Sequence, residues 1–540
     1  MTAFMSKVQT SSDTYLANRN SMLGYIDMLR SLEQRAVDLS NKRLATFEKR
    51  GQIPPHERIK RLLDPGMPFL RLHSMANYGV QIADRDKSVP GASMIIGIGF
   101  VNGTRCMLWA DDSGIAAGAA TARTTEVALS LEDICKRQKL PLIHMVESAG
   151  ANLLEYQVVQ WSNFGAVFRN LAQLSAMGIP TITVLHGGST AGGAYMPGMS
   201  DYVIGVKENG MAALGGAALV KAATGEDAND RDLGGTEMHS SVSGTVEYLV
   251  EDDAHGLLKA RELIGRLHWN KRSEGVARQP YEPPKYSPDE LAGAVPTDHK
   301  IPFDVCEVIA RVVDGSVIEE FKPRYGVSTV CAHASITGIP VGIIGNNGPI
   351  DPNGATKAAQ FIQLCDQSDT PLIFLQNTTG YMVGTEYEQA GMIKHGSKMV
   401  QAVSNARVPK ITLYIGASFG AGNYGMCGWS YQPDFLFAWP SARTGVMAGQ
   451  SAAKTMSHVA KVTAARRGEE VPEEVLAAQE ARIQAIFDPQ EDAFYTSGLV
   501  LDHGIIDPRD TRKVLAFCLE TVLEARAREL RPNAFGVARL

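Results

Sequence analysis

The sequence predicts an α/β protein built from two related domains, and three observations carry that prediction. The chain has 540 residues, more than a single hydrophobic core usually supports. Short apolar runs alternate with helical stretches, which is typical of βαβ layering. Blocks of sequence also recur in the same order in the two halves, which indicates a duplicated domain.

The repeat is clearest in two pairs of segments. LPLIHMVESAG (140–150) matches TPLIFLQNTTG (370–380), an offset of 230 (370 − 140). IPTITVLHGGSTAGGAYMPG (179–198) matches VPKITLYIGASFGAGNYGMCG (408–428), which begins at an offset of 229 (408 − 179). Upstream, RLLDPGMPF resembles RVVDGSVIEEF, and NGTRCMLWADDSGI resembles TGIPVGIIGNNGPI. Because several blocks keep one order, a duplication explains them better than chance.

We expect the domains to cover residues 1–280 and 281–540. Residues 269–300 are rich in proline, charge and turn formers, which favours a linker there; the alternative is a long surface loop within one domain. Strands are expected at 142–146, 181–185, 372–375, 411–415 and 435–439, and helices at 161–177, 388–407, 473–487 and 511–531.

The composition is that of an ordinary globular protein. It is 44% hydrophobic and 20% charged, with a net charge of −6, so nothing favours nucleic acid or an anionic membrane as a partner. No apolar run reaches the length of a membrane span, and the N-terminus lacks the apolar segment of a signal peptide. The seven scattered cysteines form no pattern and predict buried thiols in a reducing compartment. We therefore expect a cytoplasmic protein, or one of the mitochondrial matrix in a eukaryote.

Each half contains a strand that runs directly into a glycine-rich turn and then a helix. The two segments are TITVLHGGSTAGGAY and ITLYIGASFGAGNYG. Glycine allows a close backbone approach to a ligand, and a helix N-terminus offers N–H groups that have no partner within the helix. Two such turns at equivalent places predict sites that bind an anion or stabilise an oxyanion.

Other interpretations of these turns are weaker. GASFGAG fits the nucleophile-elbow pattern around Ser418, with HGGS (186–189) as an oxyanion motif. The equivalent position in the first half is Ser189, however, and a duplicated nucleophile has no obvious use. GAGNYG (420–425) fits a dinucleotide-binding turn, but the acidic ribose ligand is missing after the next strand. The sequence lacks a Walker motif, HExxH and zinc-spaced cysteines, so we expect no metal.

The motifs resemble one known family over residues 20–530. ERIKRLLDPG, STAGGAYMPGMSDY, LVKAATGE, GYMVGTEYEQAGMIKHGSKMV and FGAGNYGMCG are similar to the carboxyltransferase β subunits of biotin-dependent acyl-CoA carboxylases. The GAGNYGMCG loop is most similar to the branch that acts on methylcrotonyl-CoA and geranyl-CoA. The resemblance implies two tandem crotonase-like (ClpP/crotonase) ββα-superhelix domains, the first for acyl-CoA and the second for biotin.

The resemblance also implies site residues. Gly192 and Gly193 would supply amides to the thioester oxygen, and Ala421 and Gly422 to the ureido oxygen of biotin. On the biotin side it adds Gly380, Tyr381, Phe419 and Gly420. No side-chain base is needed, because in this family biotin itself takes the proton.

The acyl group is indicated by a departure from the family. Where methylcrotonyl enzymes read like IFLAGPPLVKAATGE, this chain has MAALGGAALVKAATGE (211–226). Small residues in place of an aromatic would enlarge an acyl pocket, which favours geranyl-CoA over 3-methylcrotonyl-CoA; the alternative is a packing change without effect on the substrate. The expected acyl-pocket residues are Ala213, Leu214, Gly215, Gly216 and Ala217.

The resemblance finally implies partners. A separate α subunit would carry the biotin carboxylase, which uses ATP and bicarbonate, and the biotin carrier. The β subunits would form a homo-hexameric core, as in an α6β6 enzyme. Two alternatives are a carboxyltransferase subunit of a sodium-pumping decarboxylase and a non-catalytic scaffold.

Overall fold

The computed structural model describes residues 2–152, 157–272 and 275–538. These residues form two compact units. The N-terminal unit contains residues 30–276 with 498–500 and 520–540, and the C-terminal unit contains residues 1–29, 277–497 and 501–519. Helices α1 (Asp13–Asn41), α19 (Ala493–Gly498) and α20 (Thr511–Ala527) contribute residues to both.

The N-terminal unit is built on one mixed sheet. Its strand order in the described residues is β1-β2-β3-β4-β5-β6-β8, and β7 pairs with the end of β5. The strands are β1 (Leu70–Leu72), β2 (Met94–Val101), β3 (Thr104–Asp111), β4 (Leu142–Ser148), β5 (Thr181–Thr190), β6 (Tyr202–Val206), β7 (Met211–Ala213) and β8 (Tyr248–Val250). Its helices are α2 (Leu44–Lys49), α3 (Pro55–Leu62), α4 (Thr124–Gln138), α5 (Val158–Met177), α6 (Tyr195–Met199), α7 (Ala217–Thr224), α8 (Asp230–Gly234), α9 (Thr236–Met238) and α10 (Asp253–Arg266).

The C-terminal unit repeats this arrangement, with order β9-β10-β11-β12-β13-β14 and β15 paired with the end of β13. The strands are β9 (Glu319–Glu320), β10 (Thr329–Ile336), β11 (Ile339–Asn346), β12 (Leu372–Thr378), β13 (Lys410–Phe419), β14 (Phe435–Ala438) and β15 (Arg443–Gly445). The helices are α11 (Leu291–Ala294), α12 (Val305–Ala310), α13 (Pro352–Gln367), α14 (Thr385–Gln389), α15 (Met392–Asn405), α16 (Gly420–Gly425), α17 (Gly449–Ala465) and α18 (Glu473–Glu491).

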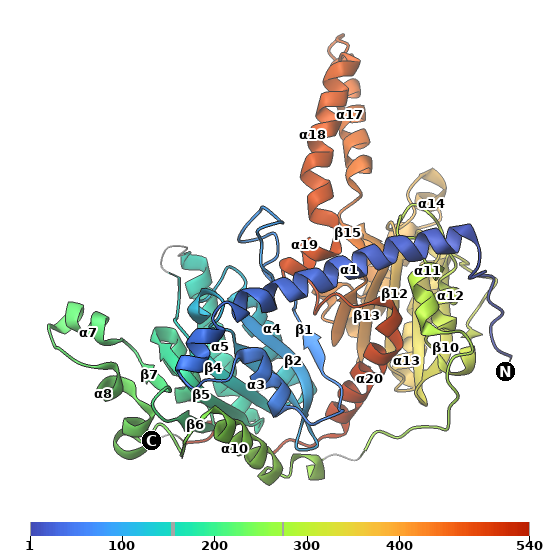
Figure 1. Ribbon diagram of the computed structural model, residues 1–540. Coiled ribbons are helices and arrows are strands. Elements are labelled where there is room, and N and C mark those ends of the chain that lie inside the picture. Colours follow the sequence, from blue (N-terminus) through green and yellow to red (C-terminus); the bar gives the residue numbers. More distant parts are fainter. Residues whose placement is uncertain (1, 153–156, 273–274, 539–540) are drawn as a thin grey trace. The chain divides into compact units, whose positions relative to one another are not determined.

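Both sheets combine an antiparallel hairpin with parallel strands. β2 pairs antiparallel with β3, and β10 with β11. The next three strands are parallel in each sheet: β4, β5 and β6 after β3, and β12, β13 and β14 after β11. This confirms the predicted α/β class with mixed sheets, and the aligned sequence blocks occupy matching strands (Figure 1).

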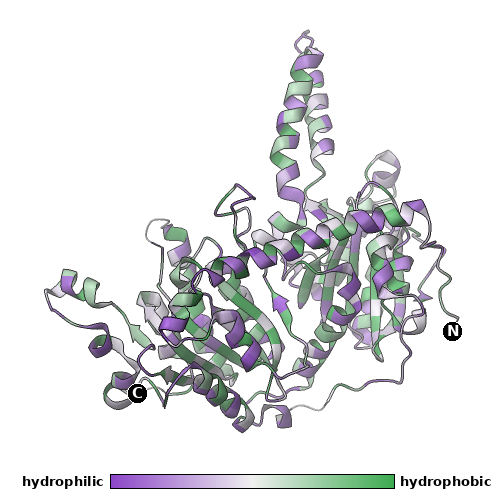
Figure 2. Cartoon of the chain, in the orientation of Figure 1, coloured by the Kyte–Doolittle hydropathy of each residue, from purple (hydrophilic) through white to green (hydrophobic). Residues whose placement is uncertain are grey.

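The central strands are almost continuously apolar, because helices cover a parallel sheet on its faces. They appear as green ribbons in Figure 2, and β3 is buried at every position. Leu108, Ile143 and Ile182 are fully buried in the N-terminal unit, and Phe361 and Phe374 in the C-terminal unit.

The expected strands are all present, and so are the four expected helical regions. The helix expected over 388–407 is interrupted, because Gly391 has a φ of +83° and separates α14 from α15. Glycine adopts this conformation without steric cost. The helix expected over 511–531 ends at Ala527.

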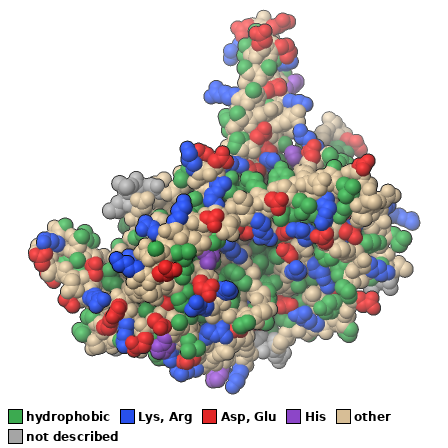
Figure 3. Space-filling view, viewed as in Figure 1, with side chains coloured by type: hydrophobic (Ala, Val, Ile, Leu, Met, Phe, Trp, Pro, Cys, Tyr) green, Lys and Arg blue, Asp and Glu red, His purple; other side chains and the backbone are tan. Residues whose placement is uncertain are grey.

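Helices α17 and α18 form a long antiparallel hairpin that stands out from the rest of its unit (Figure 1, orange). The connection between them contains exposed Arg467, Glu469 and Glu470, and the end of the hairpin is covered by charged side chains (Figure 3). An ion pair of 2.9 Å joins Lys461 and Glu473 across the two helices.

Candidate active site

The first glycine turn connects β5 to a 3-10 turn at Ala191–Ala194 and then to α6. Ala191 has a φ of +55°, an uncommon conformation for a residue with a side chain. A Cβ at Gly193 would lie 2.8 Å from the Ser189 Oγ, so no larger residue fits there without a shift. At Gly192 the nearest atoms, from Phe164 and Phe168, would be at 3.6 and 3.7 Å, an ordinary contact distance. Of the two predicted glycines, therefore, only Gly193 is demanded by close packing.

The second glycine turn connects β13 to α16 with the same geometry. Gly420 has a φ of +57° and follows Ala191 by 229 positions (420 − 191), the offset of the sequence repeat. A Cβ at Gly422 would lie 2.8 Å from the Gly380 Cα and 3.0 Å from the Thr378 Cγ2. The amides of Ala421 and Gly422 belong to the first turn of α16, where helical N–H groups have no intrahelical acceptor. Ala421 is exposed and Gly422 is buried.

The strands before the two turns are also distorted in the same place. The pairing of β4 with β5 changes register between Val146 and Ser148, after which Ser148 faces Ser189. The pairing of β12 with β13 changes register between Gln376 and Thr378, after which Thr378 faces Ser418. Such irregularities redirect the end of a strand and are frequent beside active sites. Both turns therefore follow a strand whose pairing changes register at the equivalent position.

The predicted acyl-pocket segment lies beside the first turn. β7 pairs with the end of β5, which places Ala213 opposite Thr190. Leu214 is 62% exposed, Gly215 follows it, and Gly216 caps the start of α7. The Ala217 amide donates a hydrogen bond of 2.8 Å to Asp230.

The predicted biotin-side residues surround the second turn. Gly380 follows β12 with a φ of +125° and lies against Gly422. The Tyr381 hydroxyl donates a long hydrogen bond of 3.4 Å to the Gly396 carbonyl, and burial raises the pKa of this tyrosine. The Phe419 side chain is buried in the unit and lies near the His299 ring, so it supports the turn from beneath.

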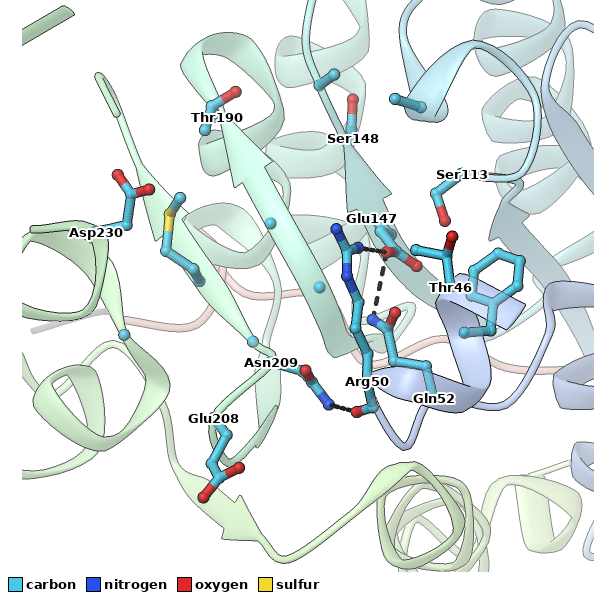
Figure 4. Close-up of a pocket in the computed structure, with 18 of the residues that line it drawn as sticks. Thr46, Arg50, Gln52, Ser113, Glu147, Ser148, Thr190, Glu208, Asn209 and Asp230 are labelled. Atoms are coloured by element: carbon cyan, nitrogen blue, oxygen red, sulfur yellow. Dashed lines mark hydrogen bonds and ion pairs between the residues drawn. The ribbon is translucent and has the colours of Figure 1, made fainter. Parts of the chain in front are cut away.

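A cavity of about 530 Å³ opens in the N-terminal unit at the carboxyl ends of β4 and β5. Its wall combines cationic and anionic side chains with the backbone of Gly187 and Gly188. Figure 4 shows Arg50 and Gln52 both directed at Glu147, while Asn209 holds the Arg50 carbonyl through a 2.8 Å hydrogen bond. The charged lining residues are Arg43, Arg50, Glu147, Glu208, Asp230, Arg231 and Glu237.

A buried ionic network, absent from the sequence-based site, lies beneath this cavity. The fully buried Arg58 guanidinium donates two hydrogen bonds, of 3.1 and 3.2 Å, to one oxygen of Glu147. Its Nε lies 3.4 Å from Asp253, which in turn bonds to His186 Nδ1 at 2.7 Å. Gln52 links the network to β5 by donating to the His186 carbonyl at 2.8 Å. The network thus connects α3, β4, β5 and α10.

The pKa values of His186 and Asp253, neighbours at one end of this network, are shifted in directions that favour its charge distribution. Burial, with the nearby Arg58 charge, lowers the pKa of His186, so its ring is neutral near pH 7. Burial opposes ionisation of Asp253, but the interactions with His186 and Arg58 hold the pKa of that carboxyl below its usual value. The network is therefore centred on the Arg58 cation, held between two carboxylates.

Ser418 does not form a nucleophile elbow. It lies within β13, is completely buried, and donates a hydrogen bond of 2.6 Å to Gln376. His503 has its Nδ1 bonded to the Leu436 amide. The serine is thus part of the packing behind the turn.

The described residues hold no group of three or more His, Cys, Asp or Glu side chains placed to bind a metal ion. Nor does any helix among them have the length and apolarity needed to cross a membrane. All seven cysteines are buried and none is in a disulfide, which confirms the prediction of buried thiols.

Comparison with known families gives one match that covers most of the chain. The model of the carboxyl transferase domain matches residues 47–537. The chain belongs to the carboxyl transferase family. This confirms the resemblance found in the motifs.

Relatives of this carboxyl transferase align over nearly the whole chain. It is 43% identical to a probable biotin-dependent acyl-coenzyme A carboxylase β2 subunit of Mycobacterium tuberculosis, over 99% of both chains. It is 41% identical to the mitochondrial methylcrotonoyl-CoA carboxylase β chain of Arabidopsis thaliana, over 99% of this chain and 91% of that one. Among solved structures, the β subunit of P. aeruginosa geranyl-CoA carboxylase superposes with a TM-score of 0.93 at 45% identity, with complete coverage of both chains.

Proposed function

We propose that this carboxyl transferase is the carboxyltransferase component of a biotin-dependent acyl-CoA carboxylase. It would move a carboxyl group from carboxybiotin to the γ-carbon of a branched α,β-unsaturated acyl-CoA. The observation that supports this is the pair of matching junctions, each with a strand, a register change, a residue of positive φ and a helix start. A transfer between two carbonyl-containing partners needs two places that stabilise negative charge on oxygen, and the chain has two such junctions.

At the first junction, the amides of Gly192 and Gly193 would bind the thioester oxygen. Negative charge develops on this oxygen when the γ-proton leaves. Fixed backbone donors stabilise such charge without reorganisation, and one donor is commonly worth about 10²–10³ in rate. The close contact behind Gly193 holds the amide in place.

At the second junction, the amides of Ala421 and Gly422 would bind the ureido oxygen of biotin. The close packing behind Gly422, where a Cβ would lie 2.8 Å from the Gly380 Cα, would hold the second of these amides in place. The fit is also supported by the exposed apolar Val383 and Ile393 on the following segment and helix, since the thioether ring and alkyl chain of biotin are apolar. When bound, carboxybiotin supplies the carboxyl group and accepts the substrate proton; this chain would orient it and stabilise its oxygen.

The repeated strand order leads us to propose that the two units are crotonase-like domains related by duplication. Residues 1–280 would form the acyl-CoA side and residues 281–540 the biotin side. A partner α subunit would provide the biotin carboxylase, using ATP and bicarbonate, and the biotin carrier. The β chains would assemble as a homo-hexamer within an α6β6 enzyme, in the bacterial cytoplasm or a mitochondrial matrix.

For the acyl group we propose geranyl-CoA. Ala213 stands beside the first turn where an aromatic side chain would fill the space, and the P. aeruginosa β subunit named for geranyl-CoA superposes closely. The relatives named for methylcrotonyl-CoA, at 41 and 42% identity, make 3-methylcrotonyl-CoA the alternative.

A steady-state comparison tests the proposal. The chain is expressed with its cognate α subunit, and ATP-dependent fixation of labelled bicarbonate is measured with geranyl-CoA, 3-methylcrotonyl-CoA and propionyl-CoA. We expect kcat/KM to be highest for geranyl-CoA and lowest for propionyl-CoA. Equal or better turnover of 3-methylcrotonyl-CoA would discard the longer substrate, and no fixation with any ester would discard the carboxylase assignment.

A further inference from the structure

The second glycine turn is wrapped by a network of neutral polar side chains inside the C-terminal unit. Its members are Gln376 on β12, Tyr414 and Ser418 on β13, and Asn423 on α16. Gln376 and Ser418 are completely buried, and Tyr414 is 5% exposed. Buried polar groups are costly unless they are hydrogen-bonded, and these four satisfy one another.

Gln376 connects the strand to both sides of the turn. Its Nε2 donates to the Met426 carbonyl at 2.7 Å, at the carboxyl end of α16. Its Oε1 accepts from the Ser418 hydroxyl at 2.6 Å, just before the helix begins. One side chain therefore fixes the residues on either side of α16.

Asn423 ties the middle of α16 to the same strand. Its Nδ2 donates to the Ser418 Oγ at 2.7 Å and lies 3.0 Å from the Tyr414 hydroxyl. The Tyr414 hydroxyl also accepts from the Trp429 amide at 3.3 Å, beyond the end of the helix. The helix is therefore held at its start, middle and end.

The N-terminal unit builds its turn without such a network. At the repeat offsets of 230 and 229, Gln376, Tyr414 and Asn423 correspond to Val146, Leu185 and Ala194. Only the serine is kept, as Ser189, and its buried hydroxyl has no hydrogen-bond partner in the part of the chain that the structure describes. The network is thus not a requirement of the strand–turn–helix fold, which points to a task specific to the second turn.

We propose that Gln376, Ser418 and Asn423 are positioning residues that fix the α16 amides for the transfer step, acting through Ala421 and Gly422. This rests on the proposed function of the second turn as the biotin side. A helix of six residues has too few internal hydrogen bonds to hold its own direction. Catalytic donors must be held to within about 0.5 Å, and a displacement of about 1 Å can cost roughly 10²-fold in rate.

The test uses variants that remove one hydrogen bond with little change in volume. Ser418→Ala deletes the shared hydroxyl, and Gln376→Met replaces the amide by an apolar chain of similar length. The matched control is Ser457→Ala on α17, which deletes a buried hydroxyl that has no hydrogen-bond partner among the described residues and lies outside both turns. Each is assayed as the complete enzyme with its α subunit, both in steady state and as a single turnover from the pre-carboxylated carrier to acyl-CoA.

We expect Ser418→Ala and Gln376→Met to lower the single-turnover rate and kcat by about tenfold to a hundredfold. The KM for acyl-CoA should stay within about twofold, because the first turn is untouched, and Ser457→Ala should match the wild type. Unchanged transfer rates in both Ser418→Ala and Gln376→Met, or a loss expressed mainly as a raised KM for acyl-CoA, would overturn the proposal. A rate loss that appears only with a matching loss of folded enzyme in thermal unfolding would also overturn it; Ser418→Ala, the smallest change, guards against misfolding.

Gly422→Val separates this proposal from the proposed function. If Gly422→Val is inactive while Ser418→Ala and Gln376→Met retain full rates, the second turn keeps its function and only the positioning role is wrong. If Gly422→Val retains full activity, the second turn is not the oxyanion site, and both proposals are wrong.

Discussion

The two glycine turns share a backbone and differ in what supports them. In the N-terminal unit, Asp111 is the last residue of β3 and Glu147 the last but one of β4, and Asp111 accepts a hydrogen bond from the Glu147 amide at 3.1 Å. Asn346 and Asn377 occupy the matching places of the C-terminal unit. The Asn377 amide nitrogen lies 3.5 Å from the Asn346 Oδ1. Carboxylates with an arginine support one turn, and amides support the other.

This difference shows how two units of the same strand order can differ in buried charge without differing in fold. Glu147 and Asn377 both press on a glycine of the next strand, at 2.6 Å from a Cβ on Gly187 and 2.5 Å from one on Gly416. The steric role is therefore conserved within the chain, while the charge is not. A carboxylate requires a buried cation as counter-charge, and an amide requires only hydrogen bonds.

The largest effect is expected from removing that cation. Arg58→Met leaves Glu147 and Asp253 buried without their counter-charge, which typically costs about 3–5 kcal/mol. Chemical denaturation should show this loss, and hydrogen exchange should locate it in the N-terminal unit. Arg61→Met is the control on the same helix, because that side chain is 51% exposed and should change stability by less than about 0.5 kcal/mol. Equal stability of the two variants would contradict the ionic account of this support.

Gly193→Val should nearly abolish carboxylation. The new side chain would meet Ser189 and Ser148 and displace an amide whose loss is worth about 10²–10³ in kcat. Gly198→Ala in α6 is the control, since nothing lies within 4 Å of a Cβ there. Steady-state assays of the complete enzyme compare them. Substantial activity in a folded Gly193→Val enzyme would remove the first turn from the mechanism.

Asp502→Asn should raise the free energy of unfolding, whereas Arg58→Met should lower it. Burial raises the pKa of Asp502 to about 7, although Ser497 donates a hydrogen bond to it. The unfolded chain releases this proton near its ordinary value of 3.8, so the folded state loses stability as the pH rises from about 4 to 7. The variant should be about 2–4 kcal/mol more stable than the wild type at pH 8 and nearly equal to it at pH 4. Urea unfolding at the two pH values measures the difference in stability between the variant and the wild type. If that difference is the same at pH 4 and pH 8, the raised pKa of Asp502 is wrong.

The smallest effect is expected at the pocket beside the first turn. Ala213 pairs with Thr190 at the first turn, and Gly445 pairs with Phe419 at the equivalent place of the second turn. A larger residue at position 213 would therefore narrow the space beside the first turn only. Ala213→Phe should lower the ratio of kcat/KM for geranyl-CoA to that for 3-methylcrotonyl-CoA by about tenfold, since the contact of even one methylene group in a hydrophobic pocket is worth about 1–3 kcal/mol. Gly445→Ala should leave this ratio unchanged. If Ala213→Phe leaves the ratio of the two kcat/KM values unchanged, the acyl chain does not bind beside residue 213.

Sequence reasoning reached the elements that repeat. The paired motifs identified β4, β5, β12 and β13 and both turns, because local apolar patterns and glycines specify them. The sequence shows that VESAG has a glutamate where QNTTG has an asparagine. It does not show that Arg58 neutralises Glu147, because the two residues lie 89 positions apart in the chain. The Gln376–Ser418–Asn423 network could not be predicted either, because it depends on the register change between β12 and β13, which the amino-acid sequence does not show.

That register change carries a consequence for how this enzyme can evolve. Successive side chains of a strand point to opposite faces, so inserting or deleting a single residue before either turn would reverse every later side chain and swing the turn away from its site. The two units carry different residues at equivalent strand positions, such as Glu147 and Asn377, so we expect these strands to tolerate a substitution better than a change of length. We expect insertions to be tolerated in the helical connections, and the two units differ there: the C-terminal unit has the long α17–α18 hairpin where the N-terminal unit has the short α7 and α8.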